Sequence, residues 1–84
     1  MYNYETEKPK IFTEKGMNEF IEVRDEAQRL LADAGAFKMF SALKGVTGDS
    51  WLMMAYVDHL VKTGLIREIT SDDVAGQNRV FVST

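Results

Sequence analysis

Few side chains in this sequence combine the types and spacing that catalysis or metal binding requires. His59 is the single histidine and cysteine is absent, which excludes thiolate chemistry, disulfides and cysteine-based zinc sites. A metal site at His59 would need further ligands at suitable spacing, and the sequence offers none. The serines have only His59 as a candidate base, and no glycine-rich phosphate loop is present. We therefore expect a protein that is not an enzyme and that has no metal, cofactor or small-molecule substrate.

Residues suited to binding a macromolecule gather in the stretch 46–69. Asp49 or Ser50 can cap a helix that Gly64 ends, because glycine adopts the positive φ required after a helix without strain. Helical spacing predicts a buried side centred on Val57 and Leu60. The opposite side is predicted to point outward and to carry Trp51, Ala55, Asp58 and Lys62, with Leu52 and His59 beside it.

This predicted outward side is rich in apolar residues, which favours a protein interface. Exposed aromatic and apolar side chains often mark contact surfaces and supply much of the binding energy. The predicted contact residues are Trp51, Leu52, Met54, Ala55 and Tyr56. An alternative stays open for Trp51, which lies in the first helical turn and could fold back over the neighbouring elements.

The segment before this helix is predicted to form an extended arm at 1–12 and two helices. Pro9 biases Lys8 toward an extended conformation. The arm is either a partly ordered tail or a segment whose aromatic residues pack on a neighbouring subunit. Thr13 can cap a helix over 14–34 that Gly35 ends, and 36–44 is predicted to form a shorter helix.

The segment after Gly64 is predicted to form two strands. Residues 65–70 and 78–82 are rich in β-branched and aromatic residues, and the polar segment 71–77 between them predicts a hairpin loop. We expect residues 13–84 to form one domain, because 84 residues are too few for two cores.

This order of elements resembles the winged-helix superfamily, in which a β-hairpin closes a helix-turn-helix. The residues that carry the resemblance are Val57, Leu60, Gly64 and the pair Leu65-Ile66, and it covers about residues 20–82. The resemblance implies a small α+β winged helix-turn-helix domain with three helices followed by a two-stranded wing. It also implies that the outward side of the central helix reads the DNA major groove.

The sequence departs from a DNA reader at several positions. Trp51, Leu52, Ala55 and Asp58 offer little to base edges, and Asp72 and Asp73 in the expected wing would repel phosphates. The net charge is −3, whereas DNA-binding modules usually carry a basic excess. The candidate DNA contacts are Lys38, Lys44, His59, Lys62, Arg67 and Arg79.

Composition sets the broad class. Hydrophobic residues make up 45% of the chain, enough for a folded core. No apolar run reaches the roughly 20 residues of a membrane span, and the N-terminus does not resemble a secretory signal, so we expect a cytoplasmic protein. We favour a non-catalytic winged-helix module that binds a protein partner or forms a homodimer. The alternative is a small DNA-binding transcriptional regulator that uses the same helix and the wing.

Overall fold

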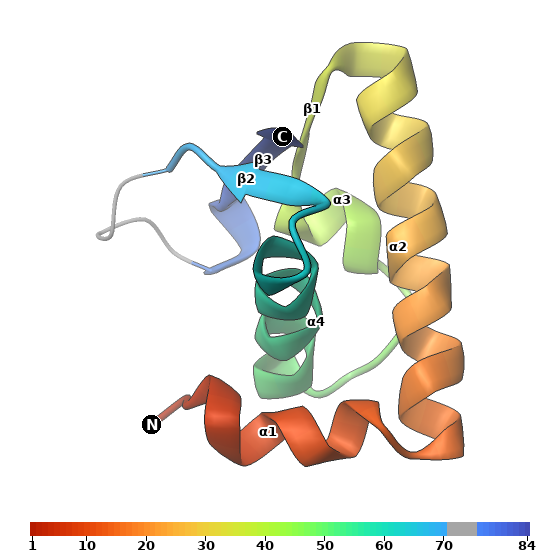
Figure 1. Cartoon of the computed structure of the whole chain (residues 1–84), viewed down its shortest axis with the longest axis vertical. Coiled ribbons are helices and arrows are strands. Elements are labelled where there is room, and N and C mark those ends of the chain that lie inside the picture. The colour runs from red at the N-terminus through yellow and green to blue at the C-terminus, as the bar shows by residue number, and fades with distance from the viewer. Residues whose placement is uncertain (71–75) are drawn as a thin grey trace.

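The computed structural model describes residues 1–70 and 76–84, which form an α+β fold with one more helix and one more strand than the sequence suggested. The described helices are α1 (Tyr4–Ile11), α2 (Glu14–Ala34), α3 (Met39–Leu43) and α4 (Ser50–Lys62). The described strands are β1 (Ala36–Lys38), β2 (Ile66–Glu68) and β3 (Val80–Ser83), and residues Gly76–Asn78 form a 3₁₀ helix. In Figure 1, α4 lies between α1 at the bottom and the strands at the top, with α2 at one side.

The ends of the two long helices confirm the sequence prediction. Thr13 Oγ1 accepts a hydrogen bond from the Gly16 amide at 3.0 Å, which satisfies a free donor of the first turn of α2. Asp49 Oδ1 accepts from the Trp51 amide at 3.0 Å in the same way at the start of α4. After these helices Gly35 has a φ of 78° and Gly64 a φ of 82°, in the left-handed region.

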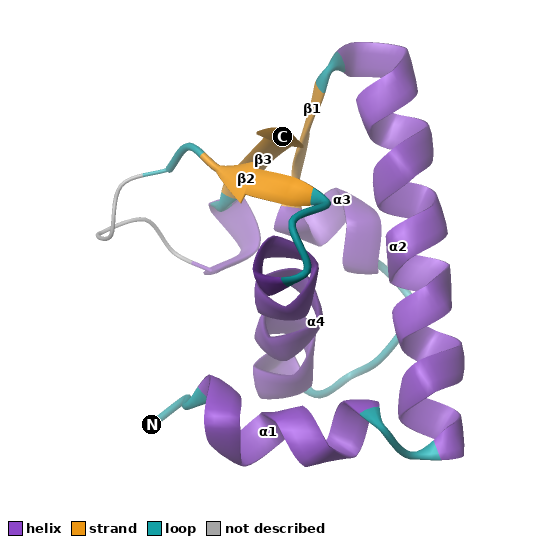
Figure 2. Cartoon of the chain, viewed as in Figure 1, coloured by secondary structure: helices purple, strands orange, loops and turns teal. Residues whose placement is uncertain are grey.

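The sheet is antiparallel, with strand order β1-β3-β2 (Figure 2). The prediction of one helix over 36–44 is wrong for its first three residues, which form β1. Phe37 lies opposite Phe81 in the register, and their rings stack with centroids 5.5 Å apart. A three-residue strand is too short to show an alternating pattern, and it exists because β3 supplies a partner.

The prediction of an extended arm at 1–12 is also wrong, since these residues contain α1. Asn3 Oδ1 accepts from the Glu5 and Thr6 amides at 2.9 and 3.3 Å and so caps this helix. Acidic residues occupy the first turn and lysines the last, an order that the helix dipole favours. These local terms, together with packing against α4, overcome the preference of Lys8 for an extended conformation before Pro9.

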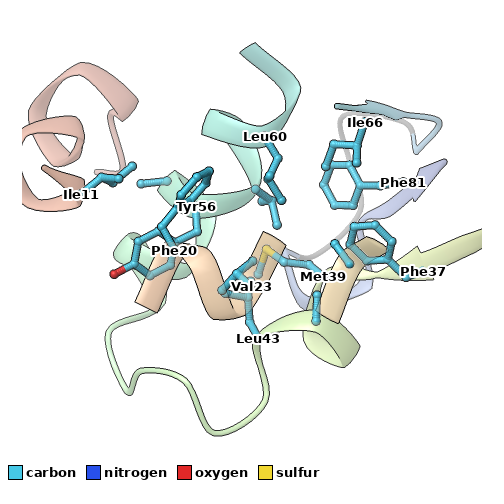
Figure 3. Close-up of a cluster of buried hydrophobic side chains, with 14 residues drawn as sticks. Ile11, Phe20, Val23, Phe37, Met39, Leu43, Tyr56, Leu60, Ile66 and Phe81 are labelled. Carbon is cyan, nitrogen blue, oxygen red and sulfur yellow. The ribbon is translucent and has the colours of Figure 1, made fainter. Parts of the chain in front are cut away.

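The core joins all the helices to the sheet. Figure 3 shows side chains from α1, α2 and α4 at one end and the aromatic side chains of β1 and β3 at the other. Ile11 of α1 is fully buried, which makes α1 part of the same core as the rest of the chain. The largest fully buried side chains are Tyr56, Phe81, Ile11, Leu43, Leu60, Val23 and Val57.

Candidate functional site

The middle of the α4 side that the sequence predicts to be outward is covered by the N-terminal segment, while Trp51 and Lys62 at its two ends stay exposed (Figure 1). A turn of two residues joins α1 to α2 and brings the end of α1 against the start of α2. Gly16 allows this approach, because a Cβ atom there would lie 1.9 Å from the Lys10 carbonyl oxygen. The N-terminal segment is therefore held across α4 by a close backbone contact.

Two tyrosines of the N-terminal segment bind polar residues of α4. Tyr2 Oη donates to Asp58 Oδ2 at 2.6 Å, and Tyr4 Oη lies 2.6 Å from Nδ1 of His59. The Lys62 ammonium group lies 5.1 Å from the centroid of the Tyr4 ring, within the range of a cation–π contact. Burial, and then the hydrogen bond to Asp58, raise the pKa of Tyr2 above its ordinary value, so this hydroxyl keeps its proton.

His59 lies among aromatic rings from three elements or turns. The rings of Phe20 and Phe12 meet it edge-on with centroids 4.9 and 5.5 Å away, and Tyr4 stacks on it at 6.3 Å. Burial lowers the pKa of His59, and the charge of Lys8 lowers it further. A neutral imidazole with its proton on Nε2 can accept a hydrogen bond from the Tyr4 hydroxyl at Nδ1. His59 therefore serves to hold α1 in place.

The predicted protein-contact residues divide into exposed and buried members. Trp51 keeps 42% of its surface exposed at the start of α4. Leu52 and Met54 are half-buried and pack against the core. The prediction that Ala55 and Tyr56 are contact residues is contradicted, because both are fully buried. Ala55 lies on the α4 face that packs against α1, while Tyr56 donates to Glu19 Oε1 of α2 at 2.6 Å.

The candidate DNA contacts do not gather on one surface. Arg79 bridges two elements, donating to Asp58 at 2.8 Å and to Glu68 at 2.7 Å, with only 16% of its side chain exposed. The hydrogen bonds to Glu68 are the main cause of a raised pKa for Arg79. The guanidinium thus links the start of β3 to β2 and α4. His59 and Lys62 contact Tyr4 of α1, so three of the six candidate DNA contacts are engaged within the fold.

The other three candidate cations are exposed, and they lie on different elements of the fold. Lys38 is in β1 and Arg67 in β2, while Lys44 follows α3. Lys44 lines an open groove of about 470 Å³ between α2 and α3 that also contains Glu22, Asp25 and Glu26. Carboxylates beside Lys44 weaken its attraction for phosphate.

Three further predictions concern the wing, metal sites and membranes. Asp72 and Asp73 lie outside the described residues. Within residues 1–70 and 76–84, no three histidine, aspartate or glutamate side chains are grouped so that they could hold a metal ion. None of the helices in this described part of the chain has the length and apolar content required to span a bilayer.

Sequence reasoning missed the role of the N-terminal segment. The available signal was Asn3 as a helix cap, followed by acidic residues and then by lysines. No local signal indicated that α1 packs on α4, since each tyrosine and its partner are more than 50 residues apart in the chain.

Comparison with known proteins found no match: no family model, no curated protein and no solved structure corresponds to this chain.

Proposed function

We propose that this chain is a non-catalytic, winged-helix-like module that binds another protein. The observation that carries the proposal is the cover of α1 over α4. A helix that reads DNA must enter the major groove with its side chains free to meet base edges. Here Asp58 and His59 instead bind tyrosines of the N-terminal segment, and Ala55 is fully buried.

The path of the chain supports the winged-helix part of the proposal. A turn joins α3 to α4, an order that resembles a helix-turn-helix pair, and the β2–β3 hairpin follows α4 directly. Such a scaffold does not itself determine function, so the side chains on its surface decide what it binds.

Trp51 is the residue that we assign to the contact. It is a large aromatic side chain that stays 42% exposed on a helix fixed by the core, and rigid aromatic anchors are typical of interface hot spots. Phe12, which follows α1, is 57% exposed and is a second aromatic side chain that a partner could contact.

The first test separates protein binding from DNA binding. We expect labelled generic duplex DNA to show no anisotropy change at low salt at protein concentrations up to roughly 10⁻⁴ M, the weak end of ordinary non-specific binding. Binding that weakens steeply with salt and that Lys44→Glu with Lys62→Glu reduces would support the regulator instead.

The second test uses a matched pair of variants, Trp51→Ser and Ile21→Ser. The two native side chains have similar exposure, 42% and 37%, but lie on different helices. Affinity capture from the organism that encodes the chain should lose specific partners with Trp51→Ser and retain them with Ile21→Ser. Sedimentation velocity of both variants tests whether the partner is a second copy. Identical capture and identical sedimentation would contradict the assignment of Trp51, provided that circular dichroism shows both variants folded.

A further inference from the structure

The sheet has an inner face in the core and an outer face that no described helix covers. The inner face carries Phe37, Phe81 and Ile66, all at most 5% exposed. Because side chains alternate along a strand, the neighbouring positions point the other way. We define the outer sheet face as Lys38, Leu65, Arg67, Ile69, Val80 and Val82.

Four of these six positions are apolar. Antiparallel sheets with one solvated face usually alternate apolar residues inward with polar residues outward. Here Ile69 is 54% exposed and Leu65 is 40% exposed, while Val80 and Val82 are half-buried. This apolar surface is not explained by packing within the described chain.

Three of these apolar residues, Ile69, Val80 and Val82, are neighbours on the outer sheet face and form an apolar strip. Val82 lies between Arg67 of β2 and Ala36 of β1 in the register. The Ile69 amide donates to the Val80 carbonyl oxygen at 3.0 Å, which places these two residues side by side. Val80 also lines a groove of about 290 Å³ that extends past β1 to Leu30 of α2.

Charge complementarity selects the occupant. Both charged members of the outer sheet face, Lys38 and Arg67, are exposed cations. The side chain of Glu68, the next residue of β2, lies on the inner face of the sheet and binds Arg79. Two copies of the chain meeting through this face would bring like charges together, which disfavours self-association here. A surface with an apolar strip flanked by cations fits an apolar strip flanked by carboxylates.

The dimensions fit a helix. Three strands at a spacing of about 4.8 Å span roughly 10 Å between the outer strands, and an α-helix with its side chains is about 10 Å across. We propose that the outer sheet face binds an acidic amphipathic helix of a partner protein, with the apolar strip on Ile69, Val80 and Val82 and the carboxylates on Lys38 and Arg67. The inference rests on the proposed function only in that the partner is a protein.

The test uses two synthetic peptides of about 18 residues, each with leucine on one helical face. One carries glutamate along both flanks, and the other carries lysine there. In a titration of the full ¹⁵N-labelled chain, we expect the glutamate peptide to shift amides of β1, β2 and β3. The lysine peptide should bind at least about tenfold more weakly.

Two variants and two controls locate the binding. Arg67→Glu combined with Lys38→Glu should weaken the glutamate peptide about tenfold or more, because both cations become carboxylates. Ile69→Ser should weaken it by removing apolar contact. Lys15→Glu and Ile21→Ser change exposed residues of α2 and should leave affinity unchanged.

Three results would overturn the inference: no shift at millimolar peptide, equal affinity for the two peptides, or shifts centred away from the sheet. Concentration-dependent dimerisation that Val82→Asp abolishes would also overturn it, since a second copy would then occupy the face. Trp51→Ser separates this inference from the proposed function. Peptide binding that survives Trp51→Ser, with no capture change in that variant, would support the sheet site alone.

Discussion

The covered face of α4 and the outer sheet face differ in polarity and in exposure. From hydropathy alone, the more polar α4 face would be expected to stay exposed and the more apolar sheet face to be buried, but the reverse is found. The α4 face contains Asp58, His59 and Lys62, yet the N-terminal segment lies over it. The outer sheet face contains Ile69 and Leu65, yet both stay exposed.

This contrast shows that chain connectivity, as well as polarity, decides which surface is covered. The two-residue turn between α1 and α2, with Gly16 against the Lys10 carbonyl, places α1 across α4. The polar groups that this burial would leave unsatisfied are paired, Asp58 with Tyr2 and His59 with Tyr4, so their desolvation is offset. No described element reaches the outer sheet face in the same way.

The largest expected difference between the two regions comes from truncating an isoleucine in each. Ile11 is fully buried, so Ile11→Ala should lower the free energy of unfolding by about 3 kcal/mol through lost burial and the cavity left behind. Ile69 is 54% exposed, and Ile69→Ala should change the free energy of unfolding by less than about 0.5 kcal/mol. Urea unfolding of both variants measures the two values. Equal losses would show that the outer sheet face is covered within the chain.

A smaller effect is expected at the contact that links α4 to the sheet. Arg79→Met removes the hydrogen bonds to Asp58 and Glu68, and we expect a loss of about 2 kcal/mol, because these side chains keep part of their hydration. The matched control is Arg24→Met, which breaks an exposed pair with Asp25 and should cost less than about 0.5 kcal/mol. A similar midpoint shift for both variants in urea would contradict a structural role for Arg79.

A still smaller effect is expected from a single hydroxyl of the cover. Tyr2→Phe removes the hydrogen bond to Asp58 and should cost about 1 kcal/mol. Because the bond holds only the start of the chain, amide hydrogen exchange should quicken first in α1. Amides of α2 beyond Arg24 serve as the internal control and should change less. Uniform acceleration throughout the chain would mean that α1 does not detach separately.

The pH dependence of the cover gives the subtlest prediction. The pKa of His59 is lowered in the folded chain by burial and by Lys8, so folding favours the neutral ring. This contribution is fully present above the unfolded pKa of about 6.5 and is lost as pH falls toward the lower folded pKa. Stability should therefore decline below about pH 6.5, before the window of Glu68, whose pKa is lowered chiefly by Arg79 from an already acidic value.

The control for this prediction is His59→Gln, which keeps a polar side chain without a group that titrates near neutral pH. The difference in unfolding free energy between the two chains should depend on pH within that window. Parallel pH profiles would show that His59 does not couple proton binding to folding.

Sequence reasoning located the elements that carry their own local signals. Thr13, Asp49, Gly35 and Gly64 act through hydrogen bonds or backbone angles within a few residues, so the limits of α2 and α4 followed from the sequence. The buried side of α4 around Val57 and Leu60 followed from helical spacing for the same reason.

Contacts between distant segments were inaccessible to the same reasoning. A helical wheel divides α4 into one inward and one outward side, but α4 has α1, α2, α3 and β2 around it, so Ala55 and Tyr56 are buried as well. The strand β1 depends on pairing with β3, which lies more than 40 residues later.

The caps of α2 and α4, the glycine turns, the α+β class and the buried side of α4 follow from the sequence, because each depends on neighbouring residues or on composition. The three-dimensional fold was required to establish that α1 covers part of α4, that Arg79 joins Asp58 to Glu68, and that the outer sheet face stays exposed. These features depend on the geometry of the turns between elements and on contacts between residues that are far apart in the sequence, which leave no local sequence pattern.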